Sequence, residues 1–280
     1  MFQLAHTVEG IQRQGTIVFV SGFVGSRRSW DRDFYKLGKH FKIIALDTLG
    51  FGESPKPDIS YTVEDHVKAI HETLAAQEVT TAHFVGHSMG CLLSLAYAAY
   101  YPAQVDSLAL LALPYFESES QARETIRNGS LFNRWLAMDT AMAKAACTLM
   151  CMLRPVLRLV APYLVRHVPH VVAKDALDHN WQSYSRTMRN VIFRGDSRKW
   201  FQAFLGRVLL VHGTRDTTAP IDNVRGLASP PRVQLLCLEA DHGLIFSHSG
   251  WIAERLREFF DVPAPADLRG NRAFGIDQQQ

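Results

Sequence analysis

Residues 81–99, TAHFVGHSMGCLLSLAYAA, join a short β-rich run to a long helical pattern. The junction is Gly86-His87-Ser88-Met89-Gly90, in which a serine has glycines two places before it and two places after it. Small residues at those places let a strand and a helix pack closely around a tight turn, which lifts the serine hydroxyl to the carboxyl end of a sheet. We therefore predict that Ser88 is a nucleophile; the alternative is an ordinary turn with a solvent-exposed serine.

The flanking sequence repeats the same alternation of strand and helix. Continuous apolar runs, typical of strands buried on both faces, occupy residues 16–21, 41–46, 81–87, 105–112, 207–212 and 232–238. Helical patterns occupy residues 62–76, 89–101, 222–228 and 250–260. This alternation predicts an α/β fold with a doubly wound, mostly parallel sheet.

The alternation stops between residues 114 and 205, where the sequence has helical patterning broken by prolines and no strand pattern. We expect this segment to be a helical cap inserted between two strands of one sheet. Residues 1–113 and 206–262 would then form the two parts of the core. The tail, residues 263–280, ends in a glutamine run and is expected to be disordered or loosely docked.

Composition favours a folded protein without a nucleic-acid partner. The 280 residues are 47% hydrophobic and 20% charged, which suits one core domain with an insertion, and the net charge of +3 comes from scattered basic residues. The N-terminus lacks a signal-peptide pattern, and four cysteines without zinc-site spacing favour a reducing cytoplasm. Charged residues and prolines interrupt the apolar residues 141–165, so we expect no transmembrane helix there.

A serine hydroxyl needs a base to become nucleophilic, and the base needs an orienting carboxylate. Asp216 and His242 each follow a predicted strand, and each would leave the sheet at the edge where Ser88 lies. We therefore predict Asp216 as the acid and His242 as the base. The competing candidates are Asp222 for the acid and His248 for the base.

A tetrahedral intermediate also needs an oxyanion hole, normally formed by two backbone N–H groups. The N–H of Met89, the first residue after the nucleophile, is one candidate. Phe23 is the other, because Gly22 gives the loop 21–26 the freedom to turn an amide inward. The alternative for this loop is a plain glycine-rich turn.

Four motifs, in chain order, resemble the α/β-hydrolase superfamily: the D-x-x-G-x-G-x-S pattern at Asp47–Ser54, Gly86–Gly90, the acid in VLLVHGTRDTTAP, and the late His242. The subgroup that the chain is most similar to has a helical cap between its sixth and seventh strands, where residues 114–205 fall. It includes esterases, lipases and C–C bond hydrolases. It also includes epoxide hydrolases and dehalogenases, whose nucleophile is an aspartate, so Ser88 argues against both.

The chain departs from the family pattern at two positions. The family's first loop usually begins His-Gly, whereas this loop begins Ser21-Gly22. A backbone oxyanion hole survives that change, although the support of the loop must differ. A glycine usually precedes the histidine, and Asp241 stands in its place.

The cap segment predicts the kind of substrate. It is rich in methionine and bulky apolar residues, which favours a lipophilic ligand, and our candidate contacts are Trp135, Met138 and Met142. Cys147 and Cys151, four apart in this segment, are expected to be buried thiols. Two groups keep open roles: the arginines Arg154, Arg158 and Arg166, which would bind an anionic substrate group or simply be solvated, and the cluster His179, Trp181, Ser183 and Tyr184.

The resemblance implies acyl-enzyme hydrolysis of a carboxylic ester or similar acyl bond, with no metal or organic cofactor. Three alternatives remain open. One is a related reaction on the same residues: C–C bond hydrolysis, thioester cleavage, acyl transfer or perhydrolysis. Another is a non-catalytic ligand-binding protein with the same fold. The third is work at a membrane surface through the cap. The oligomeric state is not predicted.

Overall fold

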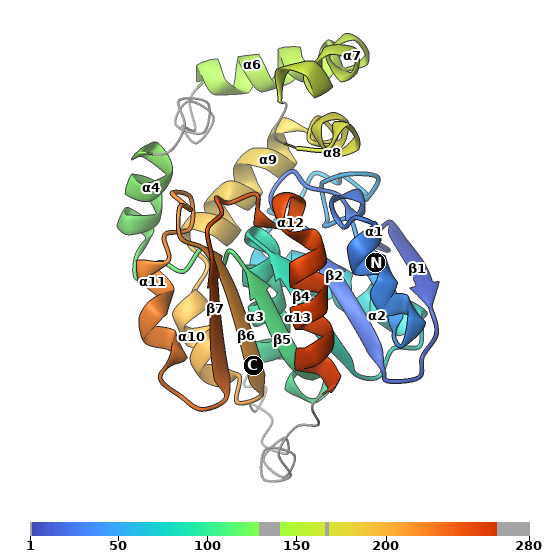
Figure 1. The fold of residues 1–280 in the computed structure, drawn as a ribbon. Coiled ribbons are helices and arrows are strands. Elements are labelled where there is room, and N and C mark those ends of the chain that lie inside the picture. The colour runs from blue at the N-terminus through green and yellow to red at the C-terminus, as the bar shows by residue number, and fades with distance from the viewer. Residues whose placement is uncertain (1, 129–140, 166–167, 262–280) are drawn as a thin grey trace, which may run out of the picture.

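The computed structural model describes residues 2–128, 141–165 and 168–261 and contains one seven-stranded sheet (Figure 1). The strand order is β1-β3-β2-β4-β5-β6-β7, and all neighbours are parallel except β1 and β3. The strands are β1 (His6–Gly10), β2 (Thr16–Val20), β3 (Lys42–Leu46), β4 (Ala82–His87), β5 (Val105–Leu111), β6 (Arg207–Gly213) and β7 (Val233–Leu238). The predicted mostly parallel α/β sheet is therefore confirmed.

Strand β1 was not predicted from the sequence. It pairs antiparallel with β3 at the sheet edge, and three of its five residues are exposed. An edge strand of this kind has no buried apolar run, which was the signal used for the other six. The bounds of those six differ from the prediction by one residue at an end.

Helices cover both faces of the sheet, because successive residues of each buried strand point to opposite sides. Val18 packs with α2 (Val63–Ala76), α3 (Met89–Tyr100) and α10 (Ser197–Ala203) in one hydrophobic cluster. Its neighbour Phe19 packs in the other cluster. That cluster lies against α1 (Arg32–Tyr35), α12 (Leu244–Ser247) and α13 (Ser249–Asp261). The predicted helix at 222–228 is α11 (Asp222–Arg225), which a 3₁₀ turn at Gly226–Ala228 continues.

The segment between β5 and β6 contains only helices in its described part. In order these are α4 (Glu119–Asn128), α6 (Ala141–Met152), α7 (Arg154–Leu164), α8 (His170–Asp175), α9 (Trp181–Thr187), a π-helical turn (Met188–Phe193) and α10. Figure 1 shows α6, α7, α8 and α9 stacked beyond the carboxyl ends of the parallel strands, with α6 and α7 outermost. We call residues 114–205 the insertion.

The described residues contain no single helix that is long and apolar enough to cross a bilayer. The pair α6 and α7 has the necessary length and composition when taken together, but the two helices meet at an angle of 99°.

Candidate active site

The turn between β4 and α3 holds Ser88 in a strained backbone conformation. Its φ of 53° and ψ of −122° are values that non-glycine residues rarely adopt. A Cβ atom on Gly86 would collide with the backbone of Gly90, and one on Gly90 would collide with the carbonyl oxygen of Val20 in β2. Both glycines of the sequence motif are therefore required by close backbone packing, as the sequence predicts.

The structure brings Ser88, His242 and Asp216 together. His242 Nε2 lies 2.8 Å from Ser88 Oγ, and His242 Nδ1 lies 2.8 Å from Asp216 Oδ2. The loops after β6 and β7 deliver the acid and the base to the edge of the sheet where Ser88 lies. The competing candidates lie elsewhere: Asp222 pairs with Arg225, and His248 pairs with Ser247.

Asp216 is buried and accepts two backbone hydrogen bonds besides its contact with His242. Its Oδ1 lies 2.8 Å from the N of Thr218 and 2.9 Å from the N of Ala219. Burial acts to raise the pKa of Asp216, but the hydrogen bond and charge of His242 and the two N–H donors outweigh burial and bring this pKa below its ordinary value. With Asp216 ionised, the proton of His242 belongs on Nδ1, and Nε2 is left to accept the Ser88 hydroxyl.

His87, which lies beside the nucleophile, supports the base. Its Nε2 lies 3.0 Å from the carbonyl oxygen of His242. Burial lowers the pKa of His87 to about 3, so this ring is neutral and its N–H can donate to that carbonyl. Asp241 accepts the N–H of Gly243 at 2.8 Å and has an exposed side chain, so it stabilises the turn at the place where the family usually has glycine.

The two predicted oxyanion-hole groups, the N–H of Phe23 and that of Met89, donate to no backbone acceptor in the part of the chain that the structure describes. Both residues line the cavity above Ser88. Met89 begins α3, where a backbone N–H has no partner within the helix. The positions are those that an oxyanion hole requires, and the assignment itself stays a prediction.

The loop that carries Phe23 is held by side chains that the sequence did not single out for this task. Ser21 Oγ donates to the carbonyl oxygen of Ser26 at 2.7 Å, and this bond braces the loop that begins Ser-Gly instead of His-Gly. Asp47, the first residue of the D-x-x-G-x-G-x-S pattern, accepts from the N of Arg27 at 2.6 Å and from its guanidinium at 2.5 Å. This pattern therefore supports the neighbouring loop.

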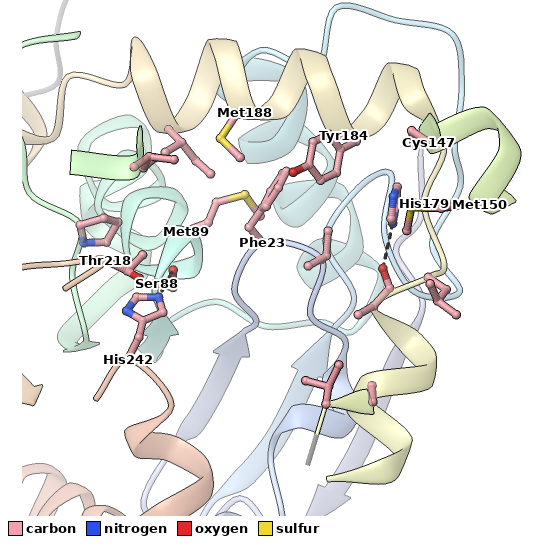
Figure 2. Close-up of a pocket in the computed structure, with 18 of the residues that line it drawn as sticks. Phe23, Ser88, Met89, Cys147, Met150, His179, Tyr184, Met188, Thr218 and His242 are labelled. Carbon is pink, nitrogen blue, oxygen red and sulfur yellow. Dashed lines mark hydrogen bonds between the residues drawn. The ribbon is translucent and has the colours of Figure 1, made fainter. Parts of the chain in front are cut away.

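A cavity of about 350 Å³ lies over Ser88, between the sheet and the insertion. Figure 2 shows Ser88 and His242 at one end, Phe23, Met89 and Met188 in the middle, and Cys147, Met150 and His179 at the far end. Most of the lining is apolar. The lining residues are Phe23, Val24, Ser88, Met89, Pro114, Phe116, Ile126, Cys147, Met150, Ala161, Val165, Ala173, Ala176, Leu177, His179, Tyr184, Met188, Ile192, Thr218 and His242.

Of the three predicted substrate contacts, the structure describes only Met142. Trp135 and Met138 lie outside the described residues. Met142 is wrongly predicted, because its side chain is 61% exposed and is not among the lining residues. Helix α6 instead turns Cys147 and Met150 toward the cavity. The sequence indicated that methionines of the insertion contact the substrate. It did not show which side of helix α6 faces the cavity, and so it did not identify Met150.

Some of the residues with open roles stabilise the insertion, and others line the cavity. Arg154 donates to the carbonyl oxygen of His179 at 2.6 Å, and Arg158 pairs with Asp178 at 3.1 Å, so both arginines hold the insertion together. Arg166 lies outside the described residues. Of the remaining cluster, His179 and Tyr184 line the cavity.

Two of the polar side chains that line the cavity, those of His179 and Tyr184, are uncharged at neutral pH. Burial lowers the pKa of His179 to about 4 and raises the pKa of Tyr184. Within the described ranges, no three His, Cys, Asp or Glu side chains are grouped so that they could hold a metal ion. The cavity therefore offers neutral hydrogen-bonding groups in an apolar wall.

Comparison with known proteins shows similarity to hydrolases. A family model described as "alpha/beta hydrolase fold" matches residues 15–137. The chain is 33% identical over 199 residues to the probable lysophospholipase BODYGUARD 4 of Arabidopsis thaliana, a match that covers 64% of this chain and 46% of the plant protein. It is also 33% identical over 124 residues to the putative carbamate hydrolase RutD of Yersinia enterocolitica, covering 44% of this chain and 45% of that protein. The chain spans about half the length of the curated relatives it matches.

Solved structures share the fold along almost the whole chain. The enol-lactonase from Burkholderia xenovorans LB400 superposes with a TM-score of 0.71 at 19% identity, covering 93% of this chain and 97% of that one. E-2-(acetamidomethylene)succinate hydrolase superposes with a TM-score of 0.73 at 18% identity, covering 93% and 96%. At such identities the likeness concerns the fold.

Proposed function

We propose that this chain, which belongs to the α/β-hydrolase superfamily, is a serine hydrolase that cleaves a carboxylic ester or similar acyl bond of a lipophilic small molecule. The observation that carries the proposal is the continuous hydrogen-bonded series Ser88–His242–Asp216, with 2.8 Å at each step, at the end of an apolar cavity. Binding alone would not require a serine, a base and an orienting acid in series.

The first half of the reaction acylates the enzyme. Ser88 Oγ attacks the carbonyl carbon of the ester while His242 Nε2 takes the hydroxyl proton, and Asp216 stabilises the imidazolium that forms. The N–H groups of Phe23 and Met89 bind the negative oxygen of the tetrahedral intermediate. The intermediate collapses, the bond to the alcohol oxygen breaks, and His242 returns the proton to the departing alcohol.

The second half releases the acid. A water molecule gives a proton to His242 Nε2 and attacks the acyl carbon of the ester on Ser88. Collapse of this second intermediate breaks the bond to Ser88 Oγ, and His242 returns the proton to that oxygen. The products are a carboxylic acid and free enzyme.

The cavity supports the lipophilic substrate class. Apolar side chains form most of its wall, and methionines such as Met150 and Met188 adapt to flexible chains. The name of the plant relative, a probable lysophospholipase, is consistent with an acyl ester of this kind.

The first test is hydrolysis of p-nitrophenyl esters with short to long acyl chains. We expect Ser88→Ala to lower kcat by at least about 10³-fold, while the control Ser229→Ala, at an exposed serine remote from the cavity, keeps the rate of the unaltered enzyme. Ester turnover that survives Ser88→Ala would refute the assignment.

A fluorophosphonate label separates the alternatives. Labelling at Ser88 without ester turnover would direct the search to C–C bond hydrolysis, thioester cleavage or acyl transfer on the same residues. Absence of both labelling and turnover would favour a ligand-binding protein with this fold.

A further inference from the structure

Helix α7 presents an apolar stripe to solvent. Val156, Leu159, Val160, Tyr163 and Leu164 follow the spacing i, i+3, i+4, i+7, i+8, which places them on one face of a helix. All five are exposed, and the exposed fraction reaches 77% at Leu164 and 70% at Leu159. A surface helix of a globular protein normally turns such a stripe toward the core.

The charged residues of α7 lie on its opposite face, which packs against the rest of the insertion. Arg158 pairs with Asp178 at 3.1 Å, and Arg154 donates to the carbonyl oxygen of His179. These bonds fix the rotation of the helix about its axis. The reversed orientation, with arginines inward and apolar residues outward, therefore results from specific polar contacts.

Helix α6 and the joint between the helices extend the stripe. Met142, Leu149, Met152 and Leu153 are between 47% and 74% exposed. We define the outer face as Met142, Leu149, Met152, Leu153, Val156, Leu159, Val160, Tyr163 and Leu164. Clusters of exposed apolar residues of this size mark surfaces that bind a partner or a membrane. In Figure 1, α6 and α7 are the outermost elements on the side of the molecule away from the sheet.

We propose that the outer face docks onto a lipid surface that carries anionic headgroups. The charge near the outer face supports this occupant over a protein partner: α6 and α7 contain no acidic residue, and among the described residues 141–165 and 168–174 the basic side chains not paired within the insertion are those of Lys144, exposed on α6, and Lys174 on α8. Apolar residues that enter the headgroup region, together with nearby basic residues, are the pattern of helices that lie in a membrane interface.

The opposite faces of the same two helices line the cavity. Cys147 and Met150 of α6, Ala161 of α7 and Val165, which follows α7, contribute to its wall. A lipid surface on the outer face would therefore be separated from the cavity by a single layer of helix. A lipophilic ester could then pass from the membrane to Ser88 without crossing bulk water. This consequence rests on the proposed function, whereas the docking itself does not.

Vesicle co-sedimentation tests the docking. The full chain is mixed with vesicles of phosphatidylcholine alone and with vesicles containing roughly one third phosphatidylserine. We expect binding to the anionic vesicles that weakens as salt is raised, because salt screens the attraction of the basic residues. The double variant Leu159→Glu/Leu164→Glu should lower the partition coefficient at least about tenfold, since two anchoring side chains are lost.

Controls make the result specific to the outer face. Leu205→Glu introduces one glutamate at a leucine that is 53% exposed outside the outer face, and it should bind vesicles like the unaltered protein, whereas Leu164→Glu alone should already weaken binding. Equal loss in both variants, or failure of the unaltered protein to bind either vesicle, would overturn the proposal. So would a dimer in light scattering that Leu159→Glu/Leu164→Glu dissociates, because a second copy would then cover the face.

The Ser88→Ala variant keeps this proposal distinct from the proposed function. It should bind anionic vesicles fully while it loses ester hydrolysis. Vesicle binding without any ester hydrolysis in the unaltered protein would refute the proposed ester hydrolysis and leave the docking surface standing, and hydrolysis without vesicle binding would do the reverse.

Discussion

Hydrogen bonds around Asp216 keep its carboxylate ionised at neutral pH. The carboxylate is buried, yet two backbone N–H groups and His242 favour its ionised form. An ionised acid keeps the proton on His242 Nδ1, which is the tautomer that leaves Nε2 free to accept from Ser88. The backbone amides of Thr218 and Ala219 therefore influence Ser88 indirectly, because they act on Asp216, which in turn orients His242.

The charge of Asp216 can be removed with little change of shape. We expect Asp216→Asn to lower kcat about 10⁴-fold with little change in KM, because His242 would adopt the wrong tautomer while the cavity stays intact. Asp222→Asn, at the exposed carboxylate paired with Arg225, is the matched control and should leave kcat unchanged. Steady-state kinetics with a p-nitrophenyl ester measures both, and a loss of less than about tenfold in Asp216→Asn would argue for another acid.

Gly90 tests the packing of the strained turn. A Cβ at this position would strike the carbonyl oxygen of Val20, which belongs to the backbone and cannot rotate away. We expect Gly90→Ala to lower the free energy of unfolding by at least about 2 kcal/mol. The comparison is Gly226→Ala, where no atom lies within 4 Å of the new Cβ, and the effect there should stay within about 1 kcal/mol. Urea denaturation measures both; equal effects would contradict the packing argument.

At the scale of elements, one buried carboxylate attaches the insertion to the first loop of the core. Asp175, the last residue of α8, accepts from Ser26 Oγ at 2.6 Å and from Arg28 Nε at 2.7 Å. Ser26 belongs to the loop that carries Phe23. The position of that loop therefore depends both on Asp47 in the core and on Asp175 in the insertion.

Weakening this attachment should affect both stability and catalysis. We expect Asp175→Asn to lower the free energy of unfolding by about 2 kcal/mol, less than for a fully buried pair because Arg28 reaches solvent. We also expect kcat to fall because the loop with Phe23 loses a support. Asp178→Asn, which disturbs only contacts within the insertion, should spare kcat. Unchanged kcat in Asp175→Asn would show that Asp47 alone positions the loop.

Sequence patterns predicted the elements but not the contacts between distant ones. Ser88, Asp216 and His242 could be identified because each follows a buried strand, and parallel strands bring their carboxyl ends to one edge. Asp175 carried no such signal, since its partners lie almost 150 residues away in the chain. Met142 was wrongly predicted for a related reason: composition identifies an apolar helix, but packing decides which face lines a cavity.

At the scale of the whole molecule, burial keeps five histidines neutral in the folded state. It lowers the pKa of His66 and His87 to about 3, and that of His83, His179 and His212 to about 4, from an ordinary value of 6.5. Below pH 6.5 the unfolded chain binds protons at these positions that the folded chain excludes. The free energy of unfolding must therefore fall as the pH falls from about 6.5 toward 4.

The expected result is a steep acid destabilisation measured by urea unfolding between about pH 7 and pH 4.5. Replacing one such residue, as in His66→Gln, should reduce the slope by up to about 1.4 kcal/mol per pH unit, whatever its effect on stability at pH 7. His40→Gln, at an exposed histidine, should leave the slope unchanged. A free energy of unfolding that stays constant over this pH range would mean that the folded protein binds protons at these histidines as readily as the unfolded chain does.

The contact of Asp175 with the first loop also limits how the insertion can be exchanged between proteins. A chimera that replaced residues 114–205 with a segment lacking an acidic residue at the position of Asp175 would remove the carboxylate that Ser26 and Arg28 contact. Such a graft would transfer a new cavity wall but leave the loop that carries Phe23 without one of its hydrogen-bond acceptors. An exchange of the insertion that aims to change the substrate range must therefore keep Ser26, Arg28 and Asp175 together.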